Sequence, residues 1–142
     1  MNEASWNDCI DSNDSIRITP DKAKAKSLIE TADGRVKYQQ EITVKKENAN
    51  YIFESYYTTV LELLHALIII AGYKVKNHLC LGFYLKDVLK RDDLFRKFDD
   101  LRYKRNSLTY YGKRMDFETA KKAIAQSTKL SQEIKSLINK NI

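Results

Sequence analysis

The stretch NANYIFESYYTTVLELLHALIIIAG, residues 48–72, decides the fold of this chain. Asn48 is a favoured helix N-cap, and Gly72 is a favoured residue just beyond a helix C-terminus, so the stretch predicts one helix that ends at Ala71. Apolar residues occur on most sides of that helix. Such a helix lies at the centre of a bundle or against another subunit.

The same stretch is too short and too interrupted to be expected in a membrane. Its most apolar part runs from Val60 to Ala71 and contains Glu62 and His65. A bilayer core about 30 Å thick needs roughly 20 consecutive apolar residues. We therefore expect a buried core helix and no membrane partner.

Further helices are predicted on both sides of the central one. Thr19-Pro20-Asp21 is a helix start, and Asn77, an aspartate of Asp92-Asp93, and Asp116 are expected N-caps. The predicted helical segments are 19–45, 77–90, 94–108 and 116 onwards, with a turn over 110–115. The fold class expected is all-α, an antiparallel up-and-down bundle of four to five helices.

Length and composition set the domain organisation. The chain has 142 residues, enough for one domain, with four glycines and one proline, which are few for an all-β or loop-rich protein. We expect residues 19–142 to form the helical domain. Residues 1–18 are expected to be an N-terminal arm, either poorly ordered or docked through Trp6 and Ile10.

The cysteines and the N-terminus indicate a cytoplasmic protein. Cys9 and Cys80 lie far apart without a second pair, which argues against a disulfide scaffold and against a zinc site. This usage is typical of a reducing cytosol. The first twenty residues are polar and acidic, unlike a signal peptide.

The net charge of +6 is concentrated in the second half of the chain. Residues 76–142 hold sixteen basic and eight acidic side chains. A basic surface attracts polyanions such as RNA or nucleotides, and lysines on a solvated face give the same composition. The chain has no Gly-rich phosphate loop, no dinucleotide fingerprint and no His-Glu-x-x-His helix, so no cofactor and no metal are expected.

Arg105 interrupts the apolar stripe of the fourth predicted helix. Leu94, Phe98, Leu101 and Leu108 define the stripe, and Arg105 falls on the same helical series. A guanidinium in that position is expected to pair with an acid or to line a cleft. The candidate acids are Glu54 and Glu62 on the central helix, and Asp99 and Asp100 on its own helix.

Several short motifs occur in an order that resembles the HEPN family of small helical proteins. They are residues 50–57 (NYIFESYY), 72–74 (GYK), 77–81 (NHLCL) and the pair Arg105-Asn106. The family includes components of prokaryotic toxin–antitoxin systems and partners of nucleotidyltransferases. The resemblance covers about residues 20–140, and the ending Tyr110-Tyr111-Gly112 is similar to that of an archaeal-like branch.

The resemblance implies a homodimer with an RNA cleft between two copies of an Arg-centred motif. In active members Arg holds the scissile phosphate and a His four to six residues later moves a proton, without metal. Arg105 and Asn106 match this motif, whereas the histidine window holds Tyr110, Tyr111 and Gly112. Tyrosine has an ordinary pKa near 10, so it is a poor general base at neutral pH.

Two functions follow as hypotheses. In the first, a dimer cleft binds RNA or a nucleotide through Arg105, Asn106, Tyr110 and Tyr111, with Arg105 and Tyr110 as the candidate catalytic pair of a weak or degenerate metal-independent ribonuclease. Glu54 and Arg102 are the expected supporting residues. In the second, the chain is a non-catalytic interaction module for a minimal nucleotidyltransferase, and Arg105 serves the assembly.

Overall fold

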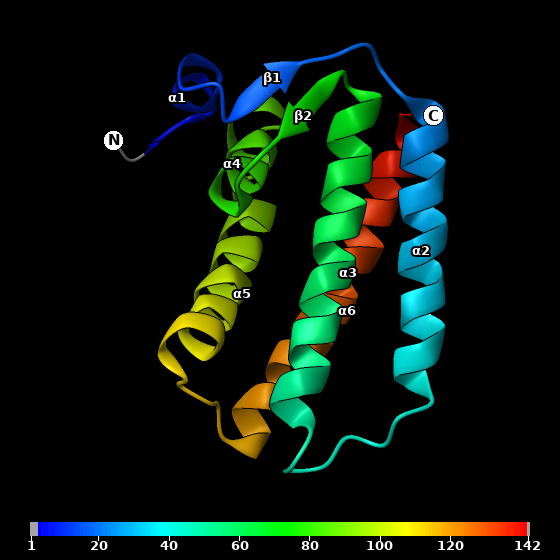
Figure 1. Ribbon diagram of the computed structural model, residues 1–142, viewed down its shortest axis with the longest axis vertical. Coiled ribbons are helices and arrows are strands. Elements are labelled where there is room, and N and C mark those ends of the chain that lie inside the picture. The colour runs from blue at the N-terminus through cyan, green and yellow to red at the C-terminus, as the bar shows by residue number, and fades with distance from the viewer. Residues whose placement is uncertain (1–2, 142) are drawn as a thin grey trace.

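Four long helices form the body of the protein in the computed structural model, which describes residues 3–141 (Figure 1). They are α2 (Lys22–Gln40), α3 (Ala49–Ile70), α5 (Asp92–Tyr111) and α6 (Phe117–Lys140). Helix α3 contacts all three of the others. The predicted all-α class and the helical bundle are confirmed.

Helix α3 is the core of this bundle. Phe53, Tyr57, Val60 and Leu64 are at most 1% exposed, and buried residues occur on most sides of the helix. Within residues 3–141, α3 is the one helix long and apolar enough to cross a membrane, and 67% of its most apolar window is buried inside the molecule. Its apolar surface therefore packs against the neighbouring helices.

Local capping sets several helix ends where the sequence predicts them. The Asn77 side chain accepts a hydrogen bond from the Cys80 N–H at 2.8 Å, and Asp116 accepts one from the Thr119 N–H at 2.8 Å. Gly72 follows α3 with a φ of +93°, and a Cβ there would lie 3.1 Å from a backbone oxygen. Asn77 and Asp116 are thus favoured N-cap residues, and the conformation at Gly72 requires glycine.

The first and third predicted helices are shorter than expected. Helix α2 is capped by Asp21, which accepts from the Lys24 N–H at 2.9 Å, and it ends at Gln40. The predicted last turns, up to Lys45, belong to a loop. Asn48 stabilises this loop, because its side-chain oxygen accepts a hydrogen bond from the Lys45 N–H at 2.8 Å. The third helix is divided into α4 (His78–Phe83) and a π-helical turn, η1 (Tyr84–Val88).

The fourth helix is longer than expected, which changes the place of the motif tyrosines. Helix α5 continues through Tyr111 and ends at Gly112, which has a left-handed φ of 63°. The prediction that Tyr110 and Tyr111 lie in a turn was therefore wrong. The left-handed residue ends the helix, and that role falls to glycine rather than to the tyrosines before it.

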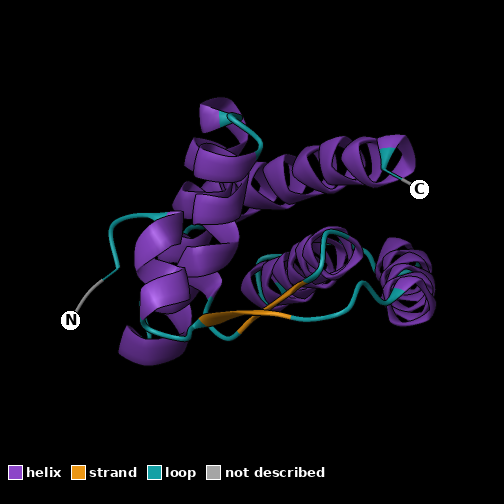
Figure 2. Cartoon of the chain, turned by 90° about the horizontal axis from the view of Figure 1, so that it is seen from above, coloured by secondary structure: helices purple, strands orange, loops and turns teal. Residues whose placement is uncertain are grey.

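The N-terminal arm is docked. Helix α1 (Trp6–Asp11) and strand β1 (Ser15–Arg17) lie at one end of the bundle, and β1 pairs antiparallel with β2 (Tyr73–Val75) (Figure 2). Trp6 is 7% exposed and packs edge-on against Tyr73 and Tyr84, with ring centroids 5.3 and 5.2 Å away. This small sheet was not predicted, because its strands lie far apart in the sequence.

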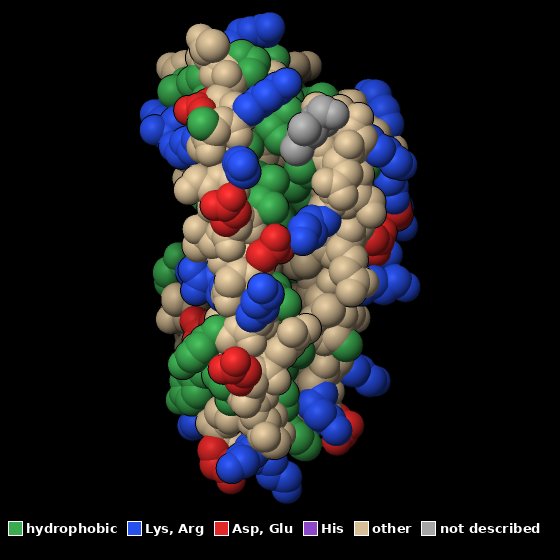
Figure 3. All heavy atoms as spheres, turned by 90° about the vertical axis from the view of Figure 1, so that its right-hand side faces the viewer, with side chains coloured by type: hydrophobic (Ala, Val, Ile, Leu, Met, Phe, Trp, Pro, Cys, Tyr) green, Lys and Arg blue, Asp and Glu red, His purple; other side chains and the backbone are tan. Residues whose placement is uncertain are grey.

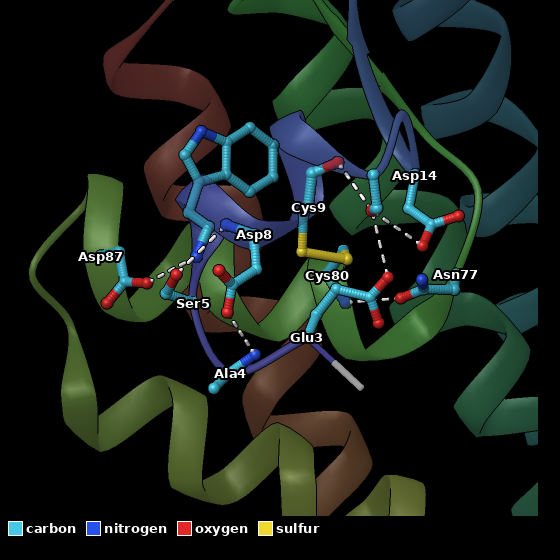
Figure 4. The surroundings of a disulfide bond; sticks show 11 residues. Glu3, Ala4, Ser5, Asp8, Cys9, Asp14, Asn77, Cys80 and Asp87 are labelled. Carbon is cyan, nitrogen blue, oxygen red and sulfur yellow. Dashed lines mark hydrogen bonds between the residues drawn. A yellow bond between two sulfur atoms is a disulfide. The ribbon is translucent and has the colours of Figure 1, made fainter. Parts of the chain in front are cut away.

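A disulfide bond joins the arm to the body. Cys9 of α1 is bonded to Cys80 of α4, with 6.0 Å between their Cα atoms (Figure 4). The sequence argued against a disulfide scaffold, but the docking of α1 brings together two cysteines 71 positions apart, and they form one bond. Disulfides are rare in the cytosol of mesophiles, so the cysteines no longer support the expected cytoplasmic location.

Candidate functional site

A cavity of about 380 Å³ opens where the first turn of α4 faces the second half of α5. Its lining is rich in cations and hydrogen-bond donors, namely Lys76, His78, Arg102, Arg105, Asn106 and Tyr110. One acid, Glu3, reaches the same cavity from the arm, where its carboxylate accepts a hydrogen bond from the Ser12 hydroxyl at 3.1 Å. Four of the predicted site residues, Arg102, Arg105, Asn106 and Tyr110, are thus brought together, whereas Tyr111 and Glu54 are not part of the lining.

Arg105 is partly buried between two aromatic rings. Its guanidinium carbon lies 5.8 Å from the ring centroid of Tyr57 and 5.7 Å from that of Tyr110. Its Nη1 donates a long hydrogen bond of 3.4 Å to the Asn106 side-chain oxygen. The π-faces explain how a charged residue occupies an apolar stripe, because an aromatic face attracts a cation.

The expected carboxylate partners of Arg105 on α3 are engaged elsewhere. Glu62 forms a two-pronged ion pair with Arg35 of α2, with a shortest distance of 2.9 Å. Glu54 accepts a hydrogen bond from the Thr109 hydroxyl at 3.3 Å. The prediction that either acid pairs with Arg105 was wrong, because Glu62 faces α2 and Glu54 lies nearer the end of α5.

The acids of α5 are also paired with other residues. Asp99 binds Arg102 at 2.9 Å, and Asp100 binds Lys104. Among residues 3–141 no carboxylate lies within ion-pair distance of Arg105. Arg105 therefore presents its charge to the cavity without a neutralising partner.

His78 is the residue of this site that the sequence reading did not assign to it. It is the first residue of α4, and its Nδ1 lies 3.2 Å from the hydroxyl of Tyr57. Burial and the nearby positive charge of Arg105 lower the pKa of His78 to about 4, with smaller contributions from His65 and Arg102. The imidazole is therefore neutral at pH 7. The Asn77 cap signals the position of His78 on α4, but nothing local signals that α4 faces α5.

The exposed tyrosines of α5 divide into two groups. Tyr110 is 67% exposed and lines the cavity, whereas Tyr111 is 76% exposed and is not part of the lining. Tyr103 is 70% exposed and lies seven residues before Tyr110, which places both on the same side of the helix. Tyr103 does not line the cavity, so of these three tyrosines the site includes Tyr110 alone.

The charge of the cavity differs from that of the general surface. Figure 3 shows basic and acidic side chains interspersed on the face seen from the α2 side of Figure 1, as on a solvated surface. The cavity instead gathers two guanidiniums and a lysine against one carboxylate, Glu3, although one of the guanidiniums, Arg102, is also paired with Asp99. Within the described residues no group of three or more His, Cys, Asp or Glu could hold a metal ion.

This set of side chains can bind an anion, and it suits phosphate best. Guanidinium groups present paired N–H donors that match phosphate oxygens, and an exposed tyrosine ring can stack on a base. Comparison with protein-family models, with curated proteins and with solved structures finds no match to this chain.

Proposed function

We propose that this protein binds RNA or a nucleotide in the cavity around Arg105 and Asn106, with phosphate as the group that is held. The observation that carries the proposal is the partly buried Arg105 guanidinium, which has no carboxylate partner among residues 3–141. A charge removed from water without a counter-ion is unfavourable, and a bound phosphate would supply the counter-ion.

The roles of the other residues follow from their places in the cavity. Arg102 and Lys76 add positive charge, and the Asn106 amide can donate to a phosphate oxygen. Tyr110 lies beside the Arg105 guanidinium with its ring exposed, where a base can stack. Metal-independent cleavage of RNA is the catalytic form of this proposal, with Arg105 holding the phosphate and Tyr110 as the candidate proton donor.

The resemblance to the HEPN family supports a homodimer in which two such cavities face each other. The motif residues 105–110 lie along one stretch of α5, so a second copy docking on this helix would place both cavities in one cleft. A toxin-type role belongs to the same proposal, in a compartment where the Cys9–Cys80 bond persists. Cleavage is expected to be weak, because tyrosine stands where the family has histidine.

Binding of a labelled single-stranded RNA, followed by fluorescence anisotropy, tests this function. Arg105→Ala is expected to weaken binding at least tenfold and to reduce the slope of log affinity against log salt by about 0.7, the value for one lost phosphate contact. The matched control is Arg96→Ala, on the same helix, whose side chain is 79% exposed and paired with Asp92. Equal affinity of the wild type and Arg105→Ala, with both proteins folded, would exclude the proposal.

Cleavage is read in the same samples on gels. Tyr110→Phe keeps the ring beside Arg105 and removes the hydroxyl, so it separates stacking from proton transfer. We expect binding to be retained and any cleavage to be lost. Cleavage that persists unchanged in Arg105→Ala would contradict the catalytic role of Arg105.

The exposed aromatic residues of α5 favour a second function, as an interaction module for a minimal nucleotidyltransferase. Tyr103, Tyr110 and Tyr111 are 67–76% exposed, and tyrosine is enriched in protein interfaces. Under this function Tyr103→Ala and Tyr111→Ala would disrupt assembly with the partner, measured by light scattering, and leave RNA binding unchanged. Assembly that survives both changes would exclude α5 as the interface.

A further inference from the structure

Both the backbone and the imidazole ring of His78 are held in place beside the cavity. Its backbone lies in the first turn of α4, fixed by the Asn77 cap and by the neighbouring Cys80, which is bonded to Cys9. Its ring is fixed by the Tyr57 hydroxyl, 3.2 Å from Nδ1. The histidine is therefore oriented before any ligand arrives.

The hydrogen bond with Tyr57 selects one tautomer of His78. Tyr57 is 1% exposed, and burial raises the pKa of its hydroxyl well above the usual range, so it keeps its proton. Among the described residues its one hydrogen-bond partner is His78 Nδ1. A buried hydroxyl donates its proton where an acceptor is present, so Tyr57 donates and Nδ1 accepts. The proton of the neutral imidazole is then on Nε2.

The second ring nitrogen of His78, Nε2, is not engaged by Tyr57. Nδ1 points to Tyr57 in the core, and the two ring nitrogens of an imidazole point in widely different directions. Nε2 has no hydrogen-bond partner among residues 3–141, and the residue lines the same cavity as Arg102 and Arg105. His78 thus brings an N–H group, without a partner in the described part of the chain, to the lining of the cavity that holds the two guanidiniums.

We propose that His78 is a phosphate-binding residue, which Tyr57 holds as the Nε2–H tautomer so that this N–H donates to a phosphate oxygen beside Arg105. The inference rests on the proposed function and deepens it. It assigns the histidine of the site to a different helix from the arginine motif, and it makes that histidine a hydrogen-bond donor rather than a general base.

Phosphate binding changes the electrostatics of His78 in a measurable way. The charged and titratable groups around it are Glu3 from the arm, Lys76 from the loop before α4, Tyr57 and His65 from α3, and Arg102, Arg105 and Tyr110 from α5. In the free protein burial and the cations keep the imidazole neutral. An anion beside Nε2 opposes the effect of the arginines, so it raises the pKa of His78.

Nuclear magnetic resonance of the full chain can measure both the tautomer and the pKa of His78. The spectra are simple to assign because the protein has two histidines. Long-range ¹H–¹⁵N spectra assign the tautomer of His78, with His78→Gln identifying its signals. We expect Nε2–H in the wild type and a mixture of tautomers in Tyr57→Phe. We expect the pKa of His78 to rise when inorganic phosphate, AMP or a short RNA is added. An Nδ1–H tautomer, or a His78 signal that no phosphate compound shifts, would overturn the inference.

Binding measurements separate donation from structure. His78→Ala is expected to weaken phosphate-compound binding about tenfold, as for a lost hydrogen bond to a charged group. His78→Gln keeps an N–H donor near Nε2 and is expected to stay within about threefold of the wild type. His65→Gln, at the other histidine, is the control and should not change affinity. Equal losses in His78→Ala and His78→Gln would overturn the donor role.

The three ligands distinguish the sources of the phosphate. Binding of inorganic phosphate and AMP as well as RNA indicates a site for the phosphate itself, whereas RNA alone indicates that the polymer is required. If Arg105→Ala loses binding and His78→Ala does not, the inference about His78 fails and the proposed function stands. If the wild type binds none of the three, both fail.

Discussion

The guanidinium of Arg105 lies 5.8 Å from the ring centroid of Tyr57, a buried residue of the central helix. This contact anchors the cation of the cavity to the core of the bundle. The same tyrosine holds His78 through its hydroxyl. One buried side chain thus positions two residues that come from α5 and α4.

Replacement of Arg105 is expected to cost little stability. Arg105→Met removes a partly buried charge that has no carboxylate partner among the described residues, so we expect the free energy of unfolding to change by less than about 1 kcal/mol. Arg35→Met is the matched comparison, because it leaves Glu62, whose side chain is 13% exposed, without its ion-pair partner. That change is expected to cost roughly 1–3 kcal/mol. Urea unfolding measures both, and a larger loss for Arg105→Met would show a structural role for this arginine.

Reduction of the Cys9–Cys80 bond is expected to destabilise the protein. The bond closes a loop of 71 residues, for which the chain-entropy estimate is roughly 4 kcal/mol as an upper value. Urea unfolding with and without a reductant measures the effect. In the double variant Cys9→Ser, Cys80→Ser the reductant should have no effect. A wild type that unfolds identically in both conditions would show that the bond does not contribute to stability.

Stability is expected to fall as the pH falls from about 6.5 to about 4. The pKa of His78 is lowered to about 4 in the folded protein from an ordinary 6.5, so in this window the unfolded chain binds more protons than the folded protein. His65, whose pKa burial also lowers, contributes in the same direction. His78→Gln should reduce the slope of the free energy of unfolding against pH in this window. An unchanged slope would show that His78 does not titrate as described.

Two glycines inside helices are expected to respond oppositely to alanine. A Cβ at Gly82 in α4 would lie 3.1 Å from the Phe95 ring and 3.2 Å from the Phe98 ring, so Gly82→Ala should destabilise by about 1–3 kcal/mol. A Cβ at Gly34 in α2 would meet no atom within 4 Å. Gly34→Ala should therefore stabilise by about 0.5–1 kcal/mol, because alanine is the better helix former. Thermal unfolding ranks the two, and the reverse order would contradict the close packing of α4 on α5.

The sequence predicts well what neighbouring residues decide. The central helix, its end before Gly72 and the caps Asn77 and Asp116 are as expected, since each depends on groups a few positions apart. The predicted end of the fourth helix, at Leu108, is too early. The prediction assigned Tyr110 and Tyr111 to the turn, whereas in the structure both are helical and the left-handed residue at the end of α5 is Gly112. The glycine rule that placed the end of α3 before Gly72 also places the end of α5 before Gly112.

Of the candidate site, the sequence determined the chemical character, and the tertiary structure determined the partners. The spacing along one helix sufficed to mark Arg105 as a cation in an apolar stripe, whereas Asn106 and Tyr110 were named from the resemblance of residues 105–112 to the HEPN motif. The packing of α3, α4 and α5 decides which acids lie too far from Arg105 to pair with it. The same packing places His78 and Lys76 in the cavity with Arg105. The same holds for Cys9 and Cys80 and for the pairing of β1 with β2. Helix periodicity and caps act within a few residues of the chain, whereas these contacts join segments that meet only when apolar faces are buried together.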